Sequence, residues 1–184
     1  MDFKELEKFV QWQHLIRTEA HNNKELGFDK DLKDFINLMR CLPPQNYGTR
    51  IQNRIIQKLK FKKLKASDNK GDCLDNFGDH YEIKVSIIDG INIFLNVVNV
   101  RSWQKVHYYV VAFDCRSDFK CYFFRLSKNE MEYELKKIRT SNCSGTIKSN
   151  EENENVVKRF SIEIDSKDWF RWCDKYLSNA GNII

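Results

Sequence analysis

The sequence KGDCLDNFGDHYEIKVSII, from Lys70 to Ile88, predicts a strand, a tight turn and a second strand. Successive side chains of a strand point to opposite faces, so Glu82 and Lys84 share one face and the residues between and beside them point into a core. With the turn at 76–78, Asp72 lies opposite Glu82, and a cross-strand pair shares a face. The stretch therefore brings two carboxylates and a lysine to one polar spot.

Two carboxylates beside a lysine can support hydrolytic chemistry. Magnesium prefers oxygen ligands and usually takes one or two carboxylates, together with water and substrate phosphate. Asp72 and Glu82 are the candidate ligands, and the backbone carbonyl of Ile83 is a further one. Lys84 can orient or deprotonate the attacking water, or stabilise charge on the phosphate. The alternative is a solvated hairpin face that carries only a cross-strand ion pair.

A second alternative concerns the first carboxylate. If the hairpin pairs in another register, Asp75 takes the place of Asp72 as the metal ligand. Asp79 is assigned to the turn. The residues alone leave both registers open.

Length and composition describe an ordinary folded protein. A chain of 184 residues is long enough to bury a core, and we expect a single domain over 1–184. The net charge of +5 is compatible with a polyanionic partner. No apolar run approaches a membrane span, no signal sequence opens the chain, and the six scattered cysteines fit free thiols in a reducing cytoplasm.

The rest of the chain predicts an α/β (α+β) fold, with a central mixed sheet of about five strands flanked by helices. Beyond the hairpin, strands are expected at 91–100, 108–113, 121–126 and 160–164, and helices at 2–21, 29–39, 50–59, 128–139 and 167–177. Ser127 with Glu130 forms a capping box at the start of one helix, and Ser166 caps the last. The wholly apolar segment Tyr108–Phe113 predicts a central strand covered on both faces.

In this context Gly71-Asp72, followed after a turn by Tyr81-Glu82-Ile83-Lys84-Val85-Ser86, resembles the PD-(D/E)xK nuclease superfamily, and more narrowly small type II restriction endonucleases. That family has a helix, a strand with the aspartate, a strand with Glu-x-Lys, and then a strand, a helix and a strand. The resemblance covers 48–126 as the catalytic core, with 1–45 as an N-terminal helical part and 127–184 as a C-terminal part.

The resemblance implies a restriction-endonuclease-like fold and a Mg2+-dependent, sequence-specific cleavage of double-stranded DNA by hydrolysis of phosphodiester bonds. Asp72, Glu82 and Lys84 would be catalytic. A type II site-specific deoxyribonuclease is expected to act as a homodimer and to accompany a cognate DNA methyltransferase. The alternatives are a structure-specific nuclease of the junction-resolvase or repair type, and a non-catalytic DNA-binding module.

Two departures from the family pattern are visible. Gly71 stands where the family has a proline before the first acid. Many members also carry a glutamate on the preceding helix, where this chain offers Gln52 and Asn53. The expected metal site therefore has only Asp72 and Glu82 as carboxylate ligands.

Basic and polar residues outside the hairpin are candidates for DNA contacts. They comprise part of a basic stretch after Tyr47, a segment before the central strand, and a late polar loop: Arg50, Arg54, Arg101, Gln104, Lys105, Thr146, Lys148 and Asn150. Arginine and lysine suit phosphates, and arginine and glutamine suit base edges. The alternatives are a solvated helix face for the basic stretch and a surface connection for the late loop.

Overall fold

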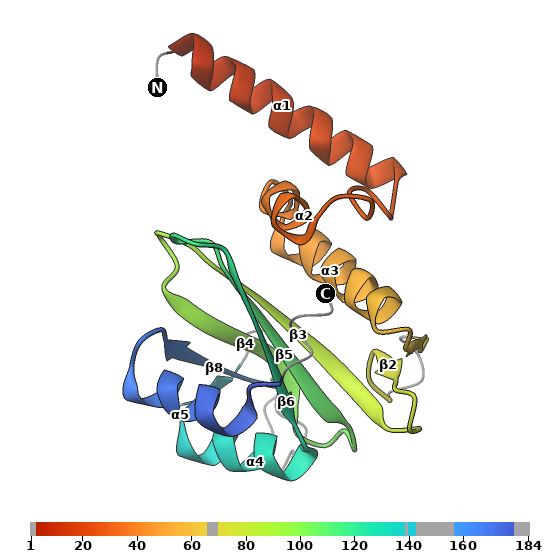
Figure 1. The fold of residues 1–184 in the computed structure, drawn as a ribbon, viewed down its shortest axis with the longest axis vertical. Helices are drawn as coiled ribbons and strands as arrows, with labels where there is room; N and C mark the ends of the chain where they lie inside the picture. The colour runs from red at the N-terminus through yellow and green to blue at the C-terminus, as the bar shows by residue number, and fades with distance from the viewer. Residues whose placement is uncertain (1–2, 66–69, 139, 143–156, 179–184) are drawn as a thin grey trace. The chain divides into compact units, whose positions relative to one another are not determined.

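The computed structural model describes residues 3–65, 70–138, 140–142 and 157–178, and the chain divides into two compact units, Met1–Ile55 and Ile56–Ile184. The N-terminal unit is helical, with α1 (Phe3–Asn22), α2 (Leu32–Met39) and most of α3 (Pro44–Lys58) (Figure 1). None of the described helices is long and apolar enough to cross a bilayer.

The second unit contains the strands of the described chain and two further helices. Its strands are β1 (Lys62–Lys63), β2 (Cys73–Leu74), β3 (His80–Ile88), β4 (Phe94–Arg101), β5 (His107–Asp114), β6 (Lys120–Leu126), β7 (Ser141–Asn142) and β8 (Val157–Glu163). Its helices are α4 (Lys128–Lys137) and α5 (Lys167–Tyr176).

Five strands form a mixed sheet in the order β1-β2-β3-β5-β6. β3 and β5 run parallel, and the other neighbours are antiparallel. β5 lies between β3 and β6, and every residue of it after His107 is buried. The sequence prediction of a mixed five-stranded sheet with flanking helices and a covered central strand is therefore confirmed.

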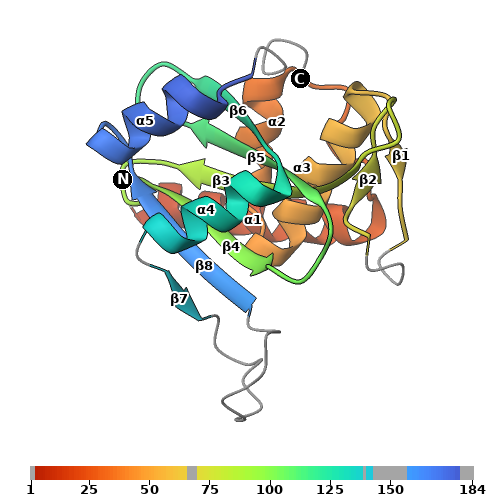
Figure 2. The same cartoon turned by 90° about the horizontal axis from the view of Figure 1, so that it is seen from below.

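The strand expected at 91–100 leaves the central sheet, which corrects the predicted strand set. It is β4, and it pairs antiparallel with β8 in a second, three-stranded sheet of order β4-β8-β7 (Figure 2). The register shifts between Val97 and Val100. Short β1 takes the fifth place in the central sheet instead, opposite β2.

Helix starts follow side-chain capping. The Asp31 side chain accepts the N–H of Asp34 at the start of α2, and Ser127 and Ser166 cap α4 and α5 as predicted. The helix expected at 50–59 begins six residues earlier, at Pro44. Proline lacks an N–H, but the first turn of a helix has no intrahelical partner for that N–H, so Pro44 starts α3 and does not interrupt it.

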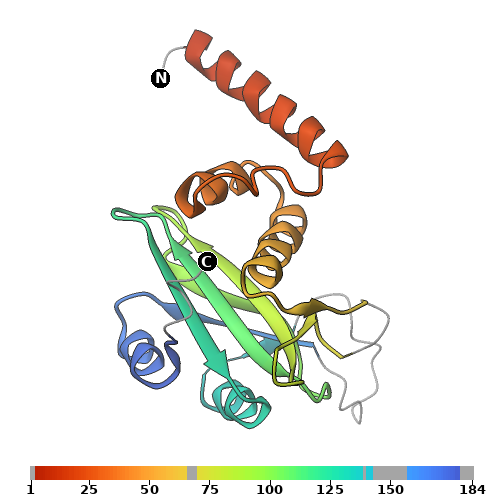
Figure 3. The same cartoon turned by 45° about the vertical axis from the view of Figure 1, so that its right-hand side comes forward.

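The core of the second unit lies between the central sheet and the two C-terminal helices, which cover the same face of the sheet (Figure 3). Phe124 of β6 packs edge-on against Trp169 and Trp172 of α5, and Trp172 also contacts Phe160 of β8. The described cysteines, Cys41, Cys73, Cys115, Cys121 and Cys173, carry free thiols, in line with the sequence prediction.

One carboxylate is fully buried in this core. Glu134 of α4 is 0% exposed and accepts hydrogen bonds from Arg171, Trp172 and Tyr176, all of α5. Burial raises the pKa of Glu134, but these hydrogen bonds outweigh burial and hold the pKa below its ordinary value. Glu134 therefore joins α4 to α5, and side chains of α5 donate hydrogen bonds to both of its carboxylate oxygens.

We expect Glu134→Ala to lower the free energy of unfolding by about 3 kcal/mol at neutral pH, because Trp172 Nε1 and the Tyr176 hydroxyl lose their buried acceptor. Since the folded-state pKa is lowered, this stabilisation is present above the ordinary pKa and is lost as the pH falls through the folded-state value. Urea denaturation followed by fluorescence measures it. A Trp12→Phe background makes every tryptophan report on the second unit.

Glu132→Ala is the matched control on the same helix. Its carboxylate lies 3.3 Å from Lys128 Nζ at the surface, and such pairs contribute about 0.5 kcal/mol or less. Equal losses from the two variants would contradict the structural role assigned to Glu134.

Candidate active site

The β2–β3 hairpin has the predicted register. Cys73 pairs with Tyr81 and Leu74 with His80. The same register places Asp75 opposite Asp79. The N–H of Asp75 donates to the Asp79 carbonyl at 3.0 Å, where the turn begins. This is the register that directs Asp72 toward Glu82.

Asp72 lies just before β2 and substitutes for a strand partner. Its backbone N–H donates to the Tyr81 carbonyl at 2.7 Å, and its Oδ2 accepts the backbone N–H of Ile83 at 2.8 Å. The carboxylate thus satisfies an N–H of β3 beyond the point where β2 pairs with it. Backbone groups of β3 therefore hold Asp72 at two points, its own N–H and its carboxylate.

Gly71 makes this approach sterically allowed. Its φ is +85°, in the left-handed region that disfavours side chains, and a Cβ there would lie 2.5 Å from the Tyr81 carbonyl oxygen. A residue with a side chain cannot occupy the position without moving one strand from the other. The glycine therefore sets the distance at which Asp72 meets β3.

Glu82 and Lys84 point to the same side of β3 and form an ion pair. Lys84 Nζ donates to Glu82 Oε1 at 2.8 Å, with the two side chains 9% and 13% exposed. Lys84 Nζ also donates to the backbone carbonyl of Asn99 at 2.8 Å. The ammonium group is thus held between its own strand and β4.

Asn99 was not among the residues expected at the site. It has φ +56° and lies where the β4–β8 register shifts, so the strand bulges and its carbonyl is turned toward Lys84. Asparagine tolerates the left-handed region better than most residues, which is the sequence signal for a bulge inside an otherwise apolar strand.

Electrostatics confirm that the acids are neighbours. Burial, and then the charge of Glu82, raise the pKa of Asp72 to about 6 from its ordinary 3.8. The Ile83 hydrogen bond and the charges of Lys84 and Arg101 act in the opposite direction without cancelling the rise. The pKa of Asp72 is thus raised first by burial and second by the neighbouring carboxylate, and a positive charge beside Asp72 would oppose both effects.

Asp75, the rival of Asp72, has a different role. Its Oδ1 accepts the backbone N–H groups of Phe77 and Asp79, each at 2.9 Å, and so closes the turn. The structure brings Asp72, Glu82 and Lys84 together and leaves Asp75 at the turn.

Tyr108 is a further neighbour of Glu82, and it was not predicted from the sequence. It pairs with Glu82 across the parallel β3–β5 ladder, and its hydroxyl donates to the Arg101 carbonyl at 3.4 Å. Burial, and then Glu82, raise the pKa of Tyr108 well above its ordinary value. No sequence signal separates it from the other aromatic residues of its strand.

The segment before β5 is placed in part beside the site. Arg101 lies close enough to lower the pKa of Asp72, and it is exposed, as is Lys105. Gln104 is only 5% exposed, and its backbone N–H donates to the Arg101 carbonyl, so its side chain is part of the interior. Of the DNA-contacting residues predicted in this segment, only Arg101 and Lys105 present their side chains at the surface.

The two arginines predicted on α3 differ from each other. Arg54 is 2% exposed, donates to the carbonyls of Gly27 and Lys30, and lies 4.3 Å from the Phe35 ring centre. That environment gives Arg54 a structural role in the N-terminal unit. Arg50 is half-buried in the same unit. Thr146, Lys148 and Asn150 lie outside the described residues.

Comparison with known proteins adds no relative. No protein-family model matches the chain, and the curated proteins searched contain no significant match. The assignment of this site therefore rests on its own geometry and chemistry.

We expect Asp72→Asn to stabilise the metal-free protein at pH 7.5 by about 1–3 kcal/mol. The folded protein keeps the Asp72 proton up to about pH 6 and the unfolded chain loses it near 3.8, so wild-type stability falls as the pH rises through that interval. An asparagine oxygen still accepts the Ile83 N–H. Urea denaturation in EDTA from pH 4 to 7.5 measures the difference, which should vanish at pH 4.

Asp79→Asn is the control, because that exposed turn residue lies in the same hairpin. If Asp72→Asn followed the wild-type pH dependence as closely as this control does, the charge repulsion assigned to the site would be absent.

We expect Gly71→Ala to lower the free energy of unfolding by at least about 1 kcal/mol more than Gly78→Ala does. Both glycines have positive φ, +85° and +92°, so the backbone cost is matched. A Cβ at Gly78 has no atom within 4 Å, whereas one at Gly71 meets the Tyr81 carbonyl. Thermal or urea denaturation of the pair isolates the steric term, and equal costs would show that the close approach is relaxed in solution.

Proposed function

We propose that this protein is a magnesium-dependent endonuclease that cleaves double-stranded DNA, of type II restriction character. The observation that carries the proposal is the meeting of Asp72, Glu82 and Lys84 on one hairpin, with the lysine held by the Asn99 carbonyl. A half-buried acid pair beside a positioned ammonium is more than a solvated hairpin face needs. It is the set of groups that phosphodiester hydrolysis uses.

The donor set fits magnesium. Two carboxylates are a number usual for Mg2+, which fills its remaining positions with water and substrate oxygens. Asp72 and Glu82 would hold it, with the Ile83 carbonyl as a further oxygen. Bound there, magnesium would supply a water of lowered pKa and charge compensation for the phosphate.

Lys84 has the geometry of a positioning and electrostatic group. An ammonium has three N–H donors, and Glu82 and Asn99 take two of them. The third can donate to the attacking water or to a phosphate oxygen. Because the side chain is nearly buried and held at both acceptors, little reorganisation is needed when a negative charge develops beside it.

The scaffold supports the same proposal. Asp72 just before β2, Glu-x-Lys on β3 and the parallel strand β5 follow one another in the expected order, but the described chain has no helix between β4 and β5, where the resemblance implies one. Two features are particular to this chain: β4 belongs to a second sheet, and α3 contains no acidic residue. The metal ligands would therefore come from the hairpin.

One such site cuts one strand, so cleavage of both strands at a palindromic sequence calls for a homodimer whose two-fold axis coincides with that of the DNA. A cognate DNA methyltransferase would protect the host. A single cleavage assay distinguishes cutting at short sequences from cutting at branched structures.

We expect the protein to cut a long linear duplex of known sequence into discrete fragments in Mg2+ and to leave it intact in EDTA. Glu82→Gln and Lys84→Ala should each lower the cleavage rate by at least about 100-fold, because each removes a group that acts on the reacting phosphate. Gel electrophoresis of the fragments measures both effects. Cutting confined to branched DNA would indicate a resolvase, and no cutting with any divalent metal would exclude a nuclease.

Asp72→Asn and Asp75→Asn form the matched pair for the first acid. An asparagine at 75 keeps the oxygen that closes the turn, so this variant should cut normally while Asp72→Asn is inactive. Mg2+ should also raise the melting temperature of the wild type at pH 7.5 and not that of Asp72→Asn. The opposite pattern for the two aspartates would reverse the ligand assignment.

A further inference from the structure

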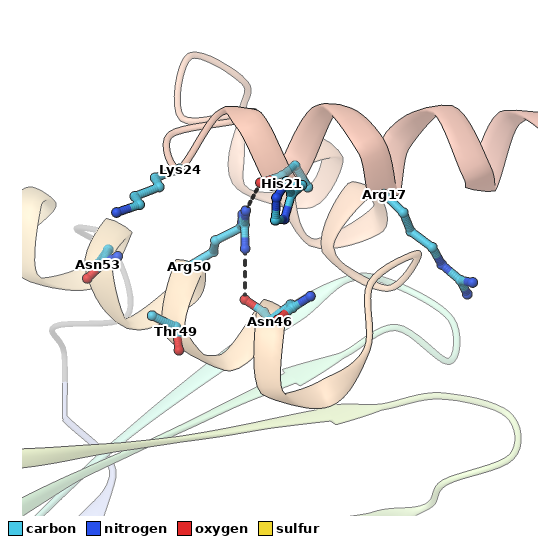
Figure 4. A pocket seen from close by; sticks show the side chains of 8 residues that line it. Arg17, His21, Lys24, Asn46, Thr49, Arg50 and Asn53 are labelled. Atoms are coloured by element: carbon cyan, nitrogen blue, oxygen red, sulfur yellow. Dashed lines mark hydrogen bonds between the residues drawn. The ribbon is translucent and has the colours of Figure 1, made fainter.

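A cavity of about 420 Å3 lies within the N-terminal unit, between α1 and α3 (Figure 4). We call it the α1–α3 pocket. Its lining consists of Arg17, Ala20, His21, Lys24, Asn46, Thr49, Arg50 and Asn53. On each side the residues follow at intervals of three, four and seven, so each set forms one face of its helix or of the turn that continues it.

The lining is cationic and rich in hydrogen-bond donors. None of the described residues around the pocket is Asp or Glu, and three carry a permanent positive charge, Arg17, Lys24 and Arg50. Within the part of the chain that the structure describes, no carboxylate forms an ion pair with any of these three. Their field therefore attracts an anion from solution.

Two of the cations are held in place by the main chain. Arg50 donates to the carbonyl of Ala20 and, at 3.4 Å, to that of Asn46, while Arg17 Nε donates to the Cys41 carbonyl at 3.2 Å. In Figure 4 Arg17 and Lys24 lie on opposite sides of Arg50. Carbonyl bonds orient a guanidinium without neutralising it, so the row of charge is preorganised.

The length of the row favours a strand over a single small anion. The pocket residues from Asn46 to Asn53 lie within α3 and span about 10 Å, and each DNA strand carries one phosphate per about 3.4 Å of duplex axis. The pocket and its two flanking cations can therefore meet two or three successive phosphates. Thr49, Asn46 and Asn53 add the side-chain types that bond phosphate and sugar oxygens.

We propose that the α1–α3 pocket binds the sugar–phosphate backbone of DNA, as a contact separate from the Asp72–Glu82–Lys84 site. The identity of the polyanion as DNA rests on the proposed function. The contact positions the duplex and carries no base recognition, because phosphates are the same in every sequence. Lys24 and Arg17 are its new members, and Arg50 is the residue already expected from the sequence.

The test is the salt dependence of duplex binding by the wild-type protein in EDTA, measured by fluorescence anisotropy. Lys24→Gln and Arg17→Gln should each weaken binding about threefold or more and reduce the slope of log K against log salt by about 0.9. Lys33→Gln, an exposed lysine on α2 outside the pocket, removes the same charge and should leave the slope unchanged. Thermal melts confirm that each variant is folded.

Slopes equal to that of Lys33→Gln would overturn the proposal, as would the absence of duplex binding at low salt. Calorimetric binding of inorganic phosphate that Lys24→Gln removes, with duplex binding unaltered, would overturn it in favour of a small-anion site. The two proposals fail separately. Pocket-dependent binding without cleavage would refute the nuclease alone, and cleavage with pocket-independent binding would refute the pocket alone.

Discussion

The ammonium group of Lys84 is almost buried, and a buried charge is stable only when acceptors surround it. One acceptor, Glu82, is supplied by the alternation of β3 itself. The other is a backbone carbonyl of β4, and β4 presents it by bulging at Asn99. Because Lys84 needs a second acceptor, the geometry of β3 and that of β4 depend on each other at this point. Lys84 is held there beside Asp72 and Glu82.

β3 and β4 are joined through side chains of β3 and share no backbone ladder. Lys84 Nζ donates to the Asn99 carbonyl, and Ser86 Oγ accepts the Asn96 N–H at 3.0 Å. β4 gives its backbone groups to β8 in the second sheet. The polar face of β3 therefore lies beside β4 without a continuous ladder between the two strands.

Local rules predicted the hairpin and reduced its register to two choices, of which the structure has the one that pairs Cys73 with Tyr81. The pairing of β4 with β8 was not predictable in the same way. It joins segments 56 to 69 residues apart, from Arg101 with Val157 to Phe94 with Glu163, and nothing in either segment specifies the other. Arg54 shows a similar limit, since its burial depends on carbonyls of a loop near Gly27 and not on its own helix. The start of α3 at Pro44 was not predicted, because a proline can follow the end of one helix or begin the next.

Gly71 bears on how the first acid is positioned. A proline, which the PD-(D/E)xK nucleases that this hairpin resembles have before the acid, is fixed near φ −65° and cannot adopt the +85° found here. This chain instead uses the absence of a side chain, so that the backbone passes within contact of the Tyr81 carbonyl and Asp72 meets the Ile83 N–H. Both solutions fix the residue before the acid, one by restricting rotation and one by permitting close approach. Under the proposed function, what matters is the position of the carboxylate relative to Glu82, and more than one backbone conformation can provide it.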